Sequence, residues 1–156
     1  MTAIEALLKR TIAELQAFIA VISAERKVLI TGDIDQLPDI SSKKSTLTTR
    51  LADLESQREA KLGAAGFGAG QPAIDAWLAA EASTNSTSAQ TAWKHLLELA
   101  AEARRENEIN GKLIATQLKQ NQQGLAALLG EPADAGTYGA NGQQKTSSGR
   151  RPLGSA

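Results

Sequence analysis

The side chains that could carry out acid–base chemistry or bind a metal ion are few in this chain and lie far apart in it. His95 is the single histidine and there is no cysteine, so a thiolate metal site is impossible. A lone histidine beside Leu96 and Leu97 is more typical of a structural or surface position than of a catalytic one. Asp33 and Asp35 precede an expected helix, where the helix dipole already accounts for acidic residues. None of these residues therefore indicates a catalytic or metal centre.

The glycine-rich segment Gly66-Phe-Gly-Ala-Gly70 resembles a phosphate-binding loop only superficially. No Lys-Ser or Lys-Thr pair follows it and no predicted strand precedes it, so the P-loop and dinucleotide-binding contexts are both missing. The serines and threonines of residues 83–88 lack a neighbouring base that could activate a nucleophile. We therefore interpret the chain as a non-enzyme that uses no cofactor.

The composition favours a single helical domain without a nucleic-acid-binding surface. Hydrophobic residues make up 42% of the 156 residues but aromatic residues only 3%, so the core must consist of Leu, Ile and Ala. Ala and Leu are strong helix formers. The 17 basic and 17 acidic residues cancel, which argues against nucleic acid as a partner. No apolar stretch is long enough to span a membrane, and Glu14 and Gln16 interrupt the region that a signal peptide would need, so we expect a cytoplasmic protein.

Apolar residues spaced by three and four predict two long helices in the first 62 residues. The first helix should begin at a capping box formed by Thr2 and Glu5 and end at Gly32. The second should begin within residues 33–38. Pro38 either kinks its first turn or marks its true start.

The rest of the sequence predicts a loop, a short helix and a third long helix. Residues 63–72 are rich in glycine and should form the loop, with the short helix opening at Pro72. Thr87 and Gln90 could cap the final helix, which should end near Gly130.

The predicted fold is therefore all-α: an elongated antiparallel coiled-coil bundle of three long helices and one short helix. The bundle should occupy residues 1–130. Residues 131–156 are too polar and too rich in glycine to build a core, so we expect a disordered, flexible C-terminal tail there.

The final helix has an apolar seam that is interrupted at its centre. The seam comprises Trp93, Leu96, Ala100, Ala103, Ile114, Leu118, Leu125 and Leu128, whereas Asn107, Asn110 and Gly111 stand where leucines would be expected. Buried amides can fix the register of packed helices, and a glycine lets another backbone approach closely. We predict that both asparagines are at least partly buried and hydrogen-bonded. We also expect that leucine at either position would preserve or raise stability while loosening the choice of partner.

Ile109 and Leu113 lie beside this seam and, with Ile114, widen the apolar face of the helix. Two interpretations remain open from the sequence. Either the helix packs against two neighbours at once, or the wide face is the edge of a groove that receives an amphipathic helix from a partner.

Several groups of residues resemble the FlgN-type flagellar export chaperones. In the first half of the chain they are Glu25-Arg26, Leu29, Gly32-Asp33, Leu37, Lys44, Leu47, Leu51, Arg58-Glu59 and Leu62. Further on, Asn107, Asn110-Gly111 and Ile114 resemble the Asn-x-x-Asn-Gly-x-x-Ile centre of the family's long helix. The end of the chain resembles the family's tail in Tyr138-Gly139, Gly142-Gln143 and the closing residues 153–156.

The resemblance implies a cytosolic chaperone for the hook–filament junction proteins FlgK and FlgL. Such a chaperone binds the amphipathic C-terminal helices of its cargo, prevents premature assembly and delivers the cargo to the type III export gate. We expect the cargo-binding surface to comprise Asn107, Ile109, Asn110, Gly111, Leu113, Ile114 and Leu118. The resemblance also implies that Tyr138 docks on the gate component FlhA. The alternative is a coiled-coil adaptor that self-associates, as in a weak homodimer, and a small hydrolase is a weaker third possibility.

Overall fold

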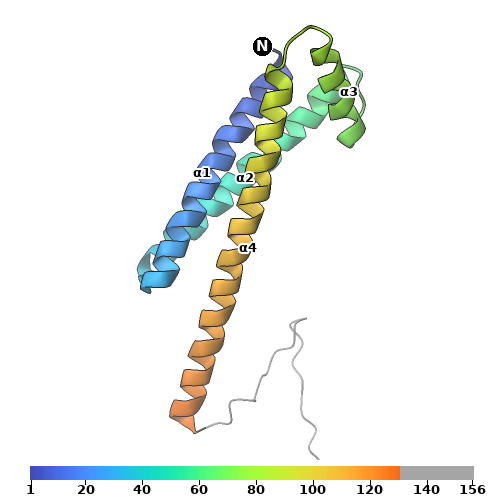
Figure 1. Cartoon of the computed structure of the whole chain (residues 1–156). Helices are drawn as coiled ribbons and strands as arrows, with labels where there is room; N and C mark the ends of the chain where they lie inside the picture. Colours follow the sequence, from blue (N-terminus) through green and yellow to red (C-terminus); the bar gives the residue numbers. More distant parts are fainter. Residues whose placement is uncertain (131–156) are drawn as a thin grey trace, which may run out of the picture. The chain divides into compact units, whose positions relative to one another are not determined.

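The computed structural model describes residues 1–130 of the chain, and these residues are almost entirely helical. The helices are α1 (Ala3–Thr31), α2 (Leu37–Ala64), α3 (Gly70–Ala82) and α4 (Ser88–Leu129), with a 3-10 turn η1 (Ile34–Gln36) between α1 and α2 (Figure 1). No strand occurs among residues 1–130, so the predicted all-α helical bundle is confirmed. The predicted flexible tail, residues 131–156, lies outside the described residues.

The chain divides into two compact units, and the buried core of the described residues lies in the first. The first unit is Met1–Ile114, and the second begins at Ala115. Within the first unit α2 runs antiparallel to α1 and to the first part of α4, while α3 lies near the end of the bundle where α1 and α4 begin (Figure 1). Among residues 115–130 no side chain is buried.

Both ends of α1 lie where the sequence predicted them, although only the Thr2 half of the predicted capping box forms. The backbone N–H of Glu5 donates to Thr2 Oγ1 at 3.1 Å, and Gly32 closes the helix in the left-handed conformation with φ of 76°. Pro38 is the second residue of α2, where its missing N–H would have had no helical partner anyway. The helix thus begins at Leu37, so the second interpretation, a start at Pro38 itself, is off by one residue.

Two local predictions are wrong. The loop is shorter than expected, because α3 begins at Gly70 rather than at Pro72, and Glu59 Oε2 accepts from the N–H of Gly70 at 3.0 Å. The Thr87–Gln90 capping box does not form. The side chain of Gln90 donates instead to the carbonyl of Leu78 at 2.8 Å, and its Oε1 has no hydrogen-bond partner.

The core of the first unit joins all four helices. Its central cluster is made of Ile4, Leu8, Leu15, Leu62, Ala73, Ile74, Trp77, Ala89, Ala92, Leu96, Leu99 and Ala103. Trp77 of α3 is 2% exposed, and the Arg58 guanidinium lies 5.1 Å from the centre of the Trp93 ring. The last apolar residue that α4 buries is Ala103, so beyond this point the helix is held by other contacts.

A carboxylate joins the beginnings of α1 and α4. Ser88 Oγ donates to Glu5 Oε1 at 2.5 Å, and Lys9 Nζ lies 3.3 Å from the same oxygen. Glu5 therefore bonds α4 instead of reaching back to the N–H of Thr2. The hydrogen bond from Ser88, assisted by Lys9 and opposed by burial, holds the pKa of Glu5 below its usual value of 4.5.

We expect Ser88→Ala to destabilise the protein at neutral pH and to have a smaller effect in acid. A carboxyl group with a lowered pKa contributes stability above its unfolded-state pKa, and that contribution is lost as the pH falls through the folded-state pKa. Urea unfolding of both proteins at about pH 7 and about pH 3 measures the difference. A loss of stability that is equal at the two pH values would show that the Ser88–Glu5 bond does not act through the ionised carboxylate.

Candidate functional site

A network of polar side chains links three helices just beyond the apolar core. Its members, called the polar network below, are Glu25 and Arg26 of α1, Lys44 of α2, and Glu106, Asn107 and Asn110 of α4. Five of the residues on which the family resemblance rested, from three distant parts of the sequence, thus meet at one place: Glu25, Arg26, Lys44, Asn107 and Asn110. The sequence alone assigned no role to the contacts between them.

Asn110 is the centre of the polar network. Its side chain is fully buried, and its Nδ2 donates to the carbonyl of Ile22 at 2.8 Å and to Glu25 Oε1 at 2.9 Å. Its Oδ1 accepts from Arg26 Nε at 2.9 Å. Every polar atom of the amide is therefore satisfied, as a buried amide requires. The prediction for Asn110 is confirmed.

The charges of the polar network are paired with one another. Glu25 is 6% exposed, and Lys44 Nζ lies 3.1 Å from its Oε1. Arg26 contacts Glu106 twice, with Nη1 at 2.6 Å from Oε2 and Nη2 donating to the backbone carbonyl at 3.0 Å. A buried carboxylate is costly unless it is paired and hydrogen-bonded, so Glu25 depends on Lys44 and Asn110.

Asn107 differs from Asn110 in its surroundings, and its predicted burial is wrong. The residue is exposed, although its Oδ1 accepts from Lys44 Nζ at 2.8 Å. Three residues along an α-helix correspond to about 300°, so Asn107 is turned about 60° away from the buried line that contains Asn110. Only the hydrogen-bonding part of the prediction for Asn107 is confirmed.

Gly111 is not explained by the packing of the described chain. The residue is exposed, and a Cβ added there would meet nothing within 4 Å. The close approach of another backbone, which we expected at this glycine, therefore does not occur among residues 1–130. A glycine inside a helix costs about 1 kcal/mol relative to alanine, and here nothing in the described chain compensates that cost.

The wide apolar face of α4 is open in this chain. Ile109 is 39% exposed and Ile114 44%, while Leu113 is half-buried. These side chains are thus only partly covered among residues 1–130, although α4 contacts both α1 and α2 at this level through Asn110 and Asn107. In the second unit Leu118 and Leu125 are likewise exposed, at 57% and 58%.

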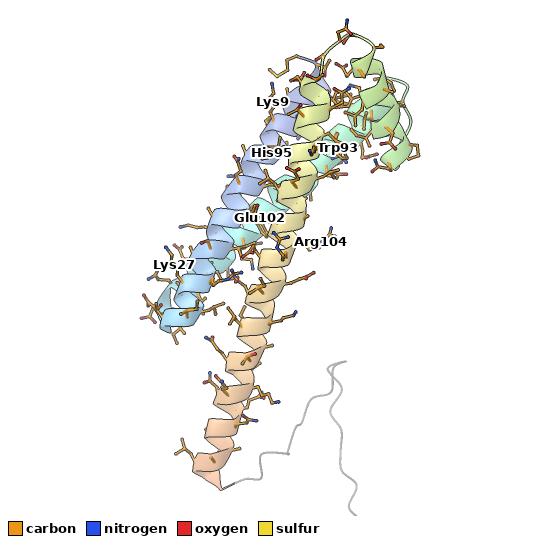
Figure 2. All side chains as sticks on the ribbon, viewed as in Figure 1. Lys9, Lys27, Trp93, His95, Glu102 and Arg104 are labelled. Atoms are coloured by element: carbon orange, nitrogen blue, oxygen red, sulfur yellow. The ribbon has the colours of Figure 1, made fainter. Side chains whose placement is uncertain are left out.

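The remaining sequence candidates do not add to this site. His95 is exposed on α4 (Figure 2), as expected for a surface position. Tyr138 lies outside the described residues. No helix within residues 1–130 is both long and apolar enough to cross a membrane.

Comparisons with known proteins give one match. A family model described as FlgN protein matches residues 1–146, which include all four helices and Tyr138. No curated protein and no solved structure matched the chain in the two other comparisons.

Proposed function

The chain belongs to the FlgN protein family, and we propose that it is a cytoplasmic chaperone for the hook–filament junction proteins FlgK and FlgL. In this proposal it binds the amphipathic C-terminal helices of these proteins, prevents their premature assembly and delivers them to the flagellar type III export gate. Membership of the family supports a role in flagellar export as a chaperone. The choice of cargo and of gate component is the part that we propose.

The observation that carries the proposal is the open apolar face of α4. Ile114 in the first unit and Leu118, four residues further along α4, are 44% and 57% exposed, and Ile109, about 140° around the helix from Ile114, is 39% exposed. Solvent-exposed isoleucine and leucine side chains that recur along one helix favour a partner helix that buries them. Burial of each such side chain is worth roughly 1.5–3 kcal/mol, so a few of them suffice for stable but reversible binding.

The polar network supports the same proposal because it anchors α4 without covering its apolar face. Asn110 and Glu106 face α1 through Arg26 and Glu25. Ile109 and Ile114, which precede and follow Asn110 on the same helix, remain exposed. The helix is thus held to α1 by polar contacts at the level where its apolar side chains are free to meet cargo.

Coexpression with a junction protein tests the proposed function. The chain is expressed with full-length FlgK or FlgL and, as a control, with the same protein lacking its C-terminal helical segment, and each mixture is passed over a size-exclusion column. We expect coelution with the full-length cargo and separate elution from the truncated one. Separate elution in both cases, with the chain forming only oligomers of itself, would favour the self-associating adaptor instead.

The tail provides a separate prediction. We propose that Tyr138 docks on the export gate component FlhA, since an isolated aromatic ring in a polar segment suits a pocket on another protein. Tyr138→Ala should leave folding and cargo affinity unchanged and weaken docking of the loaded chaperone by about 30-fold, which corresponds to ~2 kcal/mol. The variant Tyr138→Phe keeps the ring and removes the hydroxyl group, so it shows which of the two contributes to docking. The measurement is a titration of the cargo complex with the purified cytosolic domain of FlhA, and equal affinities for the wild type and the alanine variant would exclude Tyr138 from docking.

A further inference from the structure

Four exposed residues of α4 follow the spacing of a coiled-coil seam that no helix of the described chain buries, although Lys44 of α2 reaches one of them. They are Arg104, Asn107, Gly111 and Ile114, separated by steps of three, four and three residues, and all four are exposed. This group is called the exposed seam below. Alternating steps of three and four are the pattern against which a second helix packs its side chains as knobs into holes. The exposed seam therefore has the spacing of a helix-binding surface, although Ile114 is its one apolar side chain.

Each position of the exposed seam offers a different chemical group. Arg104 projects from the side of α4 (Figure 2), and among residues 1–130 it has no ion pair. Asn107 has its Oδ1 occupied by Lys44, which leaves its Nδ2 group available as a donor within the described chain. Gly111 has no side chain, and nothing lies within 4 Å of the position that a Cβ would take, so a side chain of a partner can reach the backbone of α4 there. Ile114 adds an apolar side chain that is 44% exposed.

We infer that the exposed seam selects a cargo helix of defined chemistry: an acidic residue opposite Arg104, a hydrogen-bond acceptor opposite Asn107, and a bulky apolar residue seated over Gly111. The acidic and the bulky residue of the cargo helix are then about one heptad apart, as Arg104 and Gly111 are on α4. The charge complementarity fixes the end of the cargo helix that lies beside Arg104. This inference rests on the proposed function, and it specifies which cargo helices the chaperone binds.

Lys44 acts here as a positioning residue for the amide of Asn107. Because the ammonium group can only donate hydrogen bonds, it holds the Oδ1 atom toward α2 and turns Nδ2 away from α2. The same ammonium forms an ion pair with the buried Glu25, so Glu25 holds Lys44 in place and thereby fixes the orientation of the Asn107 amide at the surface. A cargo helix meets this donor in a fixed orientation, and the ordering cost of binding is reduced accordingly.

The test is a substitution that should raise stability while it weakens binding, compared with a matched control. Gly111→Ala should raise the melting temperature by about 2–6 °C, because alanine is the better helix former. It should also weaken binding of a synthetic C-terminal peptide of FlgK by about tenfold, because the new methyl group takes the place in which the bulky cargo side chain would sit. Gly124→Ala is the control: this second helical glycine of α4 is also open within 4 Å but lies outside the exposed seam. It should leave binding of the peptide unchanged.

The charge is tested by a second pair. Arg104→Glu should weaken binding of the same peptide by about tenfold or more, with a loss that shrinks at high salt. Arg105→Glu makes the same change of net charge one residue away, about 100° around the helix, and should have little effect. If the wild type binds the peptide and Gly111→Ala and Arg104→Glu match their controls, the inference is overturned while the proposed function stands. If the wild type does not bind it, both are overturned.

Discussion

The double variant Ile114→Ala/Leu118→Ala is expected to bind the C-terminal segment of a junction protein about a hundredfold more weakly than the wild-type chain. Both side chains are exposed, at 44% and 57%, so their removal leaves no cavity and should change the unfolding free energy little. Full burial of such a side chain is worth roughly 1.5–3 kcal/mol, and about half of each remains to be buried, so the two together can contribute ~2.7 kcal/mol, a hundredfold change in Kd. Isothermal titration with the cargo segment measures the effect.

The chain offers a matched control for this experiment. Ile30 and Ile34, beside the turn between α1 and α2, are 70% and 68% exposed and belong to neither the core nor α4. The variant Ile30→Ala/Ile34→Ala removes comparable apolar surface and should keep wild-type affinity. If the two double variants bind equally well and both remain folded, the cargo does not use the apolar face of α4.

The largest expected effect on stability is that of Asn110→Leu, which should lower the unfolding free energy by about 2–4 kcal/mol. Leucine would leave the Glu25 carboxylate without the amide donor and Arg26 Nε without its acceptor, in a site where Asn110 itself has no exposed surface. Charged groups that lose a buried partner are costly in this way. The expectation from the sequence, that leucine would be tolerated or stabilising, is thereby reversed for this residue.

Asn107→Leu is the control for the same measurement. Its side chain is exposed and bonds only Lys44 among the polar network, so the change should stay within about 0.5 kcal/mol. Urea unfolding of the two variants beside the wild type provides the comparison. An Asn110→Leu protein as stable as Asn107→Leu would show that the polar network contributes no net stability.

The helices and their ends could be predicted because they depend on local chemistry. The Thr2 side chain at the start of α1 and the left-handed Gly32 at its end act over a single turn, and a sequence records such signals directly. The prediction of a Thr87–Gln90 capping box was wrong because the side chain of Gln90 donates to the carbonyl of Leu78 in α3. That competitor comes from tertiary packing, which local patterns do not contain.

The candidate site could be predicted only in part. Periodicity placed Asn107 and Asn110 on one seam, but it cannot tell which of two positions about 60° apart faces a neighbouring helix. Periodicity also does not show at which residue the other helices cease to cover the seam of α4. That depends on the lengths of the other helices: α4 has 42 residues, whereas α1 has 29 and α2 has 28, so neither could cover α4 over its full length.

The most direct test of the cargo-binding proposal is amide hydrogen exchange along α4, measured with and without a saturating C-terminal peptide of FlgK or FlgL. Exchange in the free chain should be fast where few apolar contacts are buried, and a bound helix should slow it. We expect new protection at residues 109–118 and none in α3, whose Ile74 and Trp77 are already buried in the core. Unchanged exchange at residues 109–118 in a chain that has bound the peptide would contradict the proposal and place the cargo on another surface.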